Sequence, residues 1–436
     1  MLAAPCRATR SHQYVPHQRI AFRGTRISGY PRMNSISHLK SIVIDRLQGD
    51  QAPLSQAQLS QTISFARITL IVGLVFLHYG GYPNSQSSPF DGMDPTAFPL
   101  ATFANSFVLF FFFSVVPLLS MVSGWLYFTF AAERAAPALR ERISRRLGSL
   151  YLPLVFWNTI YLALAVLLCM NLPGNAFVDQ LNFQPSEAGW REYLNAVFAL
   201  TSHPIAFQFW FVRDLLVTVL LSPLLWLALR HAPYVGMVVL GAAWLLGYDL
   251  VVFFRTDVTF FFYLGGFVRM YKVPLEIGRG ATIALTCAYV LLVALRTLAP
   301  LVVEVTPQRP ELLDMATRAM RPVGVLACWG LCVQLARTKA GAAISRYGGL
   351  SFFVFATHFP LIAAVKLMLW PLLPVESDGW MMAHYVASVA LTVAITVSTG
   401  LLLARFVPGV FALMNGGRVL PVARPASWTG SVPRSI

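Results

Sequence analysis

Long, predominantly apolar runs are the feature that most constrains how this 436-residue chain can fold. A helix of about 20 apolar residues is long enough to cross the roughly 30 Å hydrocarbon core of a bilayer. The crossing segment is helical because its backbone groups must find their hydrogen-bond partners within the protein. The sequence contains ten such runs, at residues 62–80, 103–130, 148–170, 207–229, 234–254, 258–272, 280–300, 320–337, 350–373 and 382–406. They predict an all-α, polytopic integral membrane protein with about ten transmembrane helices.

The composition agrees with this prediction and excludes other classes of protein. Hydrophobic residues make up 57% of the chain and charged residues only 12%, whereas a soluble domain carries roughly 25% charged residues. Soluble enzymes, disulfide scaffolds, disordered chains and fibrous repeats are therefore excluded. The net charge of +15 does not indicate a nucleic-acid partner, because most Lys and Arg residues lie in short segments between the apolar runs, where insertion signals place them.

The positions of the basic residues also predict the orientation of the chain in the membrane. If the N-terminus is cytoplasmic, the segments on the inner side hold 24 Lys and Arg residues and the outer loops hold 4. Basic residues are enriched in cytoplasmic loops of membrane proteins. We therefore predict that both termini are cytoplasmic.

The two ends of the chain differ in composition from its apolar middle. Residues 1–61 are predicted to be a basic, disordered cytoplasmic arm, because residues 1–32 contain six Arg, no acidic residue and no apolar signal-peptide core. A mitochondrial-type presequence and a later true start at Met33 are alternatives. Residues 411–436 are predicted to be a flexible cytoplasmic tail, since Pro, Gly, Ser and Arg predominate after Asn415.

The first apolar run carries two ionisable residues, Arg67 and His78. Ionisable groups within a membrane cost about 2.5–3.5 kcal/mol on insertion scales, so each is a functional hypothesis. Their separation of eleven residues is about three helical turns, which places both on one face with a rise of roughly 16 Å. Alternatively, Arg67 extends to the inner headgroups and His78 lies at the outer interface beside Tyr79.

Three later segments carry further polar residues. Arg213 and Asp214 follow the start of the fourth apolar run, where they either form an interhelical salt bridge or bind a histidine or substrate hydroxyl. Ser351 and His358 lie in the ninth run, where a histidine can equally be a hydrogen-bonded packing residue. The basic loop before the third run either follows the positive-inside rule or forms an interfacial helix that binds a phosphate-bearing donor; its residues are Arg142, Arg145 and Arg146.

In this order, the residues resemble the membrane acyltransferase-3 family, which includes bacterial enzymes that O-acylate cell-surface polysaccharides. The family pattern of an Arg, ten residues and a His in the first span is matched by Arg67 and His78. A VPL run ending in Ser-Gly is matched by VPLLSMVSGWLYF, with Ser123. Three further motifs have counterparts in RRLGSLYLPLVFW, FWFVRDLL with its Trp210, and YGGLSFFVFATHFPLI.

The resemblance covers about residues 60–410, and the transmembrane domain is expected at 62–410. Two features depart from the family. The glutamate that many members carry after the Trp is replaced by Asp214 at a different offset, and no C-terminal SGNH hydrolase-like domain follows.

The resemblance implies an acyl-CoA dependent O-acyltransferase of the bacterial inner membrane. It would move an acetyl or similar short acyl group to a hydroxyl of a cell-surface or exopolysaccharide sugar. Acyl-CoA, polysaccharide or lipid-linked sugar and the bilayer are the implied partners, with no bound cofactor or metal. The expected catalytic residues are His78, Arg67, Asp214 and His358. The expected donor-binding residues are Arg67, Arg142, Arg145 and Arg146, and the expected substrate-binding residues are Trp210, Arg213, Ser123 and Ser351.

Two other classes of membrane protein remain as alternatives. A transporter or flippase of a polysaccharide precursor would also carry intramembrane His, Arg and Asp, but many such proteins show paired halves that this sequence lacks. A lipid-linked glycan polymerase or ligase would have a large polar outer loop, whereas the longest outer loop expected here, at 171–206, has about 36 residues.

Overall fold

The computed structural model describes residues 45–49, 51–82, 88–172, 176–179, 181, 183–302, 310–373 and 377–420. Within these ranges the regular structure is helical and contains no strand. Residues 1–44 and 421–436 lie outside them, so the described residues do not test the disorder predicted for most of the basic arm and for the end of the tail.

The helices follow the apolar runs of the sequence. Their bounds are α2 (Gln56–Leu77), α3 (Pro99–Phe112), α4 (Val115–Tyr127), η1 (Ala132–Arg134), α5 (Ala135–Arg146), η2 (Leu147–Tyr151), α6 (Leu152–Asn171), α7 (Ala176–Asp179), α8 (Trp190–Phe198), η3 (Phe207–Phe209), α9 (Trp210–Leu220), α10 (Ser222–His231), α11 (Pro233–Leu246), α12 (Asp257–Met270), α13 (Arg279–Leu298), η4 (Ala299–Leu301), α14 (Pro310–Ala319), α15 (Arg321–Ala336), α16 (Lys339–Ser345), η5 (Arg346–Leu350), α17 (Ser351–Leu369), η6 (Trp370–Leu372), α18 (Asp378–Phe406) and α19 (Pro408–Met414).

Seven helical stretches among the described residues are long and apolar enough to cross a membrane. They are 56–77, 99–127, 132–171, 279–301, 312–336, 339–372 and 378–406, and each contains or overlaps a run expected from the sequence. The pair α9 and α10 makes an eighth if the 60° bend between them lies within one span. The expected count of about ten is not confirmed.

Apart from the bent fourth run, the spans that are missing from the expected count are the fifth and sixth apolar runs. The helices there, α11 and α12, have 14 residues each, or about 21 Å of length at 1.5 Å per residue. That is shorter than the roughly 30 Å hydrocarbon core. Helix α12 is largely buried in the bundle, whereas α11 buries only Pro233, Ala243 and Trp244. An apolar run here therefore does not mark a full crossing.

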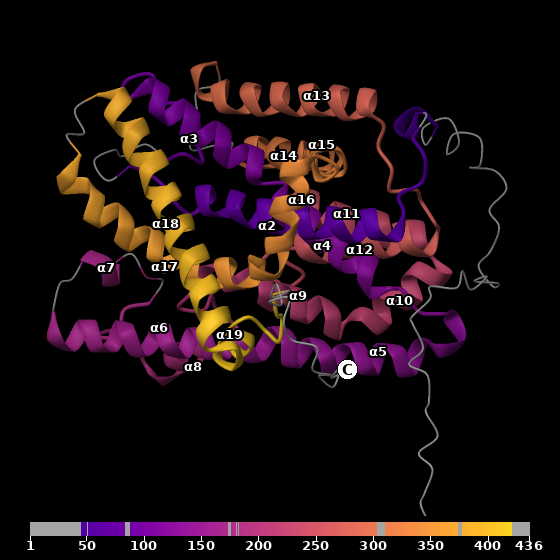
Figure 1. Cartoon of the computed structure of the whole chain (residues 1–436), viewed down its shortest axis with the longest axis horizontal. Helices are drawn as coiled ribbons and strands as arrows, with labels where there is room; N and C mark the ends of the chain where they lie inside the picture. Colours follow the sequence, from indigo (N-terminus) through magenta and orange to yellow (C-terminus); the bar gives the residue numbers. More distant parts are fainter. Residues whose placement is uncertain are drawn as a thin grey trace, which may run out of the picture.

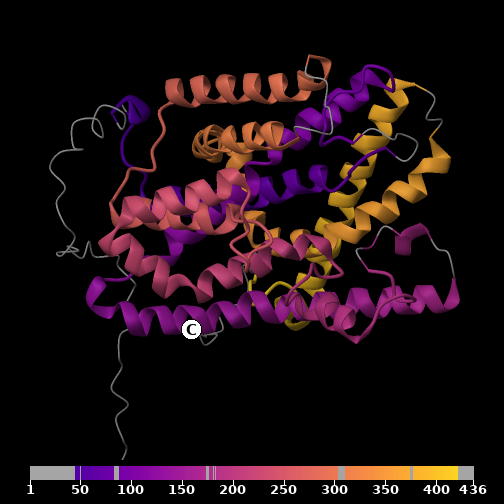
Figure 2. The same cartoon turned by 180° about the vertical axis from the view of Figure 1, so that it is seen from behind.

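Helix α2 lies in the middle of the bundle, where it contacts α3, α4, α15, α16, α17 and α18. Figures 1 and 2 show the long α5–α6 rod along one edge of the molecule and α13 along the opposite edge. The rod continues from α5 into α6 through the π-helical turn η2. The first span, with its two ionisable residues, is thus surrounded by protein.

Helices α4 and α12 pack against each other through glycines. A Cβ atom at Gly124 would overlap the Phe262 carbonyl oxygen, and one at Gly265 would overlap the Met121 carbonyl oxygen. Small residues allow backbones of membrane helices to approach closely. The Ser-Gly pair in VPLLSMVSGWLYF therefore has a packing role at its glycine.

The C-terminal segment packs onto the bundle after α19. The Trp157 indole donates to the Met414 carbonyl oxygen over 2.9 Å, and Asn415 is fully buried. The Asn415 amide nitrogen donates to the Gly349 carbonyl oxygen over 2.8 Å. The boundary at residue 411 expected for a flexible tail therefore falls inside a segment that is fixed to α6 and η5.

Candidate functional site

Helix α2 presents Arg67 and His78 to two neighbouring cavities. Arg67 lines a cavity of about 110 Å³, and His78 lines a second cavity of about 130 Å³. Phe211 of α9 and Phe355 of α17 line both cavities. Arg67 and His78, which were expected on one face of the helix, thus line two different cavities that share the aromatic residues Phe211 and Phe355.

The Arg67 cavity gathers three guanidinium groups from distant parts of the chain. Arg146 reaches it from the end of α5 and Arg418 from the segment after α19, and all three arginines are half-buried. Ser123 and Ser351 also line this cavity. It is therefore a positively charged compartment with hydroxyl groups, which suits the phosphates of a ligand.

Arg418 is fixed in this compartment by several contacts. Its guanidinium donates to the Asn415 carbonyl oxygen over 3.0 Å and lies 4.7 Å from the centre of the Phe352 ring. Burial and the nearby charges of Arg67 and Arg146 lower the pKa of Arg418 to about 10. Like charges held together in this way are stabilised when an anion binds between them.

The second cavity contains the imidazole of His78 and is mainly apolar and aromatic. The His78 ring lies 5.0 Å from the His358 ring and 5.9 Å from the Phe359 ring, centre to centre. No hydrogen bond to the His78 ring occurs among the described residues, so its nitrogens are available to a ligand. Trp210 and Gln208 contribute to the same cavity wall.

His358 is fully buried beside His78. Its Nδ1 lies 3.1 Å from the Val354 carbonyl oxygen, and because a carbonyl only accepts, Nδ1 carries the proton. Its Nε2 has no partner among the described residues. This leaves a buried acceptor nitrogen within the same aromatic cluster as His78.

Two polar side chains fix the backbone around the histidines. The Lys366 ammonium donates to the carbonyl oxygens of Tyr79 and Gly81, over 2.7 and 2.9 Å, directly after His78. The Gln208 amide donates to the carbonyl oxygens of Ala356 and Phe359, over 3.1 and 2.7 Å, on either side of His358. Helix α17 is kinked at this point, where Phe359 leaves the helical conformation.

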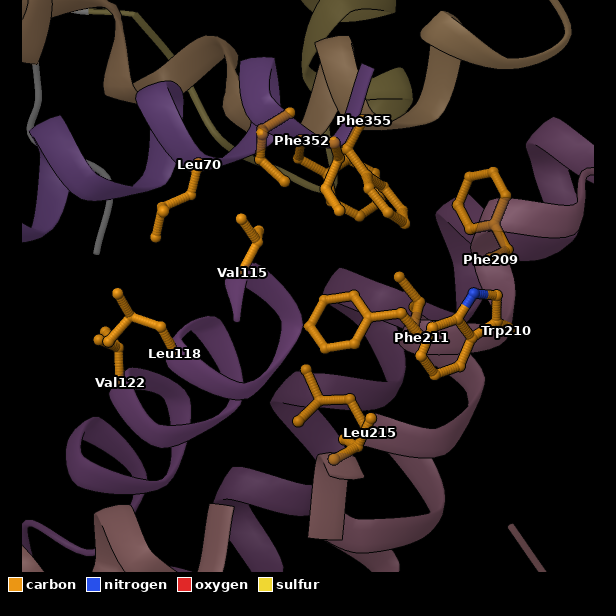
Figure 3. Packing of buried hydrophobic residues seen from close by; sticks show 14 of the residues in the cluster. Leu70, Val115, Leu118, Val122, Phe209, Trp210, Phe211, Leu215, Phe352 and Phe355 are labelled. Atoms are coloured by element: carbon orange, nitrogen blue, oxygen red, sulfur yellow. The ribbon is translucent and has the colours of Figure 1, made fainter. Parts of the chain in front are cut away.

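The rings of Phe211 and Phe355 lie in the walls of both cavities. Figure 3 shows them pointing into the space between the helices that carry Leu70, Leu118 and Leu215. Phe355 is 3% exposed and Phe211 is 9% exposed. These two rings therefore lie where the cavities of Arg67 and His78 meet, and the two residues are roughly 16 Å apart along the helix axis.

Two of the expected donor-binding arginines lie elsewhere. Arg142 donates to the carbonyl oxygens of Leu126 and Tyr127 and to the Thr129 hydroxyl, so it closes the end of α4. Arg145 is exposed and pairs with Glu141 over 2.5 Å. Among the three basic residues of this loop, Arg146 lines the Arg67 cavity and the other two do not.

Arg213 and Asp214 bind a loop rather than the histidines. The Asp214 carboxylate accepts the backbone N–H groups of Phe254 and Arg255, at 2.8 to 3.1 Å, and the Arg213 guanidinium at 2.9 Å. Arg213 also donates to the carbonyl oxygens of Ala199, Leu200 and Val252. The adjacent pair thus anchors the segment between α11 and α12, with no contact to either histidine ring.

Sequence reasoning missed Arg418, Lys366 and Gln208 as parts of this site. Arg418 lay in a segment whose composition indicated a loose tail. Lys366 had a detectable signal, since it is an ionisable residue within a predicted span. Among the described residues, no group of three His, Cys, Asp or Glu side chains could hold a metal ion.

Comparisons with known proteins identify the family of the chain. Residues 61–402 match the model of a family described as an acyltransferase domain. The chain is also 28% identical, over 368 residues, to the succinoglycan biosynthesis protein ExoH of Rhizobium meliloti (strain 1021). The aligned region covers 83% of this chain and 93% of that protein. No solved structure matches the chain.

Proposed function

Because the chain belongs to the membrane acyltransferase-3 family, we propose that it moves an acetyl or similar short acyl group from acyl-CoA to a hydroxyl of an exopolysaccharide sugar. We place the donor on the cytoplasmic side and the acceptor on the outer side of the bacterial inner membrane. The basic-residue distribution and the name of the similar Rhizobium protein support this assignment.

The observation that carries the proposal is the division of the site into two cavities. The cavity with Arg67, Arg146 and Arg418 suits the nucleotide phosphates of acyl-CoA, and the cavity with His78 suits the reacting carbonyl. A pantetheine arm is a narrow, extended chain that suits passage between Phe211 and Phe355. A planar guanidinium makes two-pronged contacts with phosphate, which explains arginine at all three positions.

The chemistry of transfer follows from the free imidazole of His78. The acceptor oxygen attacks the thioester carbonyl carbon while the imidazole takes the hydroxyl proton, typically a 10²–10⁴-fold effect. The C–S bond then breaks, and the imidazolium returns the proton to the departing CoA thiolate. The new bond is an oxygen ester, and the histidine ends in its starting state.

We assign the support of His78 to His358 rather than to Asp214. Their rings lie 5.0 Å apart, and His358 has a free Nε2. Asp214 is occupied by two backbone N–H groups and an arginine. In this proposal Asp214 is a positioning residue for the loop that precedes α12.

The test is acyl transfer from labelled acyl-CoA in membranes that contain equal amounts of each variant. His78→Ala should lose at least about 100-fold in transfer rate, because the general base is removed. His231→Ala is the matched control, since His231 is exposed at the end of α10, and it should keep wild-type activity. Near-wild-type transfer by His78→Ala would refute the assignment of His78 as general base. A wild-type protein that neither hydrolyses acyl-CoA nor transfers the acyl group would refute the proposed function.

A further inference from the structure

A third cavity, of about 280 Å³, adjoins the His78 cavity and shares no lining residue with the Arg67 cavity. The two cavities share Phe90, Phe113, Arg255 and Asp257 in their walls. The third cavity is bounded by the segment between α11 and α12 and by α13, α14 and α15. The loops that reach it are those that the basic-residue distribution assigns to the outer side.

The charged side chains that line this outer cavity leave one net positive charge. Four guanidinium groups line it, from Arg255, Arg296, Arg318 and Arg321, together with three carboxylates, from Asp249, Asp257 and Asp314. Asp257 bridges Arg255 and Arg321 over 2.7 and 2.6 Å. Asp249 and Asp314 are exposed, and neither forms an ion pair within 4 Å among the described residues.

Arg318 and Arg321 have hydrogen-bond donors to spare. The Arg321 side chain is 5% exposed, and its Nε has no partner among the described residues. Arg318 makes one hydrogen bond, to the Leu245 carbonyl oxygen over 3.2 Å, out of the five that a guanidinium can donate. A buried donor without a partner costs roughly 1–3 kcal/mol, so the cavity lacks an acceptor that a ligand can supply.

The backbone also makes room for Arg318. Gly247 follows α11 with φ of +82°, and a Cβ atom there would overlap the Arg318 guanidinium. Glycine adopts this left-handed conformation without strain. Arg296 is occupied, because it donates to Thr317 and to the carbonyl oxygens of Phe90 and Asp91. Among the described residues, the Arg255 side chain donates only to Asp257, but it is 42% exposed to solvent. The less exposed free donors therefore belong to Arg318 and Arg321.

We propose that the outer cavity binds an oxyanion of the acceptor, so that the preferred acceptor is an acidic glycan rather than a neutral one. This inference rests on the proposed function, since it names the acceptor of that same site. The oxyanion is either a carboxylate on a sugar or the phosphate of a lipid-linked sugar, because both accept the same guanidinium donors. The shared wall at Arg255 and Asp257 then sets the distance from the anion to the hydroxyl that meets His78.

The test is a binding titration of purified full-length protein in detergent. The probes are a neutral glucose disaccharide, the same disaccharide with a glucuronate, and the neutral disaccharide joined to decyl phosphate. We expect either or both acidic probes to bind at least about tenfold more tightly than the neutral one, as a charged hydrogen bond provides. The tighter of the two identifies the source of the anion. Equal binding of all three probes would overturn the inference.

Variants link the preference to the cavity. Arg318→Gln should reduce the binding of the acidic probe about tenfold and leave neutral binding unchanged, while Arg318→Lys should recover part of the loss. Arg191→Gln is the matched control, because Arg191 is an exposed arginine in another loop assigned to the outer side. An equal loss for acidic and neutral probes would contradict the inference. Binding does not depend on acyl-CoA turnover, so an inactive protein that still prefers the acid refutes the proposed function alone.

Discussion

The three arginines of the Arg67 cavity make a quantitative prediction about the proposed acyl donor. Acyl-pantetheine carries the same thioester as acyl-CoA but lacks the nucleotide and its phosphates. If Arg67, Arg146 and Arg418 bind those phosphates, the protein should use acyl-CoA far better than acyl-pantetheine. The chemistry at His78 is the same for both donors, so the difference should appear in the donor concentration required.

The size of the preference follows from the three contacts. A hydrogen bond to a charged group contributes about 1.5–3 kcal/mol, and the lower value applies because all three arginines are half-buried. Three contacts then contribute roughly 4.5 kcal/mol, or about 10³-fold in kcat/KM at 1.4 kcal/mol per factor of ten. Arg418→Gln should reduce the preference by about tenfold, because it removes one contact of the three.

The assay measures kcat/KM for both donors with a fixed acceptor. Arg145→Gln, at an exposed arginine paired with Glu141, should leave the preference unchanged. His78→Ala should lower kcat/KM for both donors by the same factor. The reasoning is refuted if wild-type protein uses the two donors equally well, or if Arg418→Gln impairs both to the same extent.

Three further predictions concern packing, the loop before α12 and the orientation. Gly124→Ala should destabilise the protein by several kcal/mol, since the new methyl group meets the backbone of α12. Gly148→Ala is the control and should not destabilise it, because a methyl group there meets nothing within 4 Å. Heating in detergent followed by size-exclusion chromatography measures the difference. Asp214→Ala should raise KM for the glycan acceptor more than KM for acyl-CoA, and an unchanged acceptor KM would contradict its positioning role. A reporter fused after Ile436 should be cytoplasmic and one inserted near Asp91 periplasmic, and the reverse result would invert the assigned sides of donor and acceptor.

The parts of the site that the sequence predicted are those set by local helical geometry. Arg67 and His78 share a face because eleven residues make about three turns, and this relation holds whatever surrounds the helix. Ser123, Ser351 and Trp210 do line the two cavities. The motifs that resemble the family's had indicated these residues as parts of one site.

The parts that the sequence did not predict depend on long-range packing. Arg418 reaches the Arg67 cavity because hydrogen bonds of Trp157 and Asn415 fix its segment. The bond of Trp157 joins residues more than two hundred positions apart in the sequence. Composition alone gave that segment the appearance of a loose tail. Asp214 resembled a catalytic acid, but its partners are backbone N–H groups of a loop, and no residue pattern records which backbone a carboxylate will meet. The same limit applies to α11 and α12, whose apolar runs form helices of 14 residues each, shorter than a bilayer core is thick.

The contribution of Arg418 to the Arg67 cavity has a consequence for biosynthesis. Arg67 is translated about 350 residues before Arg418, which takes roughly 20–70 s at 5–20 residues per second. During that interval the nascent chain can insert its first helices, but the Arg67 cavity lacks one of its three positive charges. Chains released early by the ribosome would therefore lack the complete cluster of positive charges. In the proposed function, the site for the donor phosphates is thus complete only when nearly the whole chain has been made.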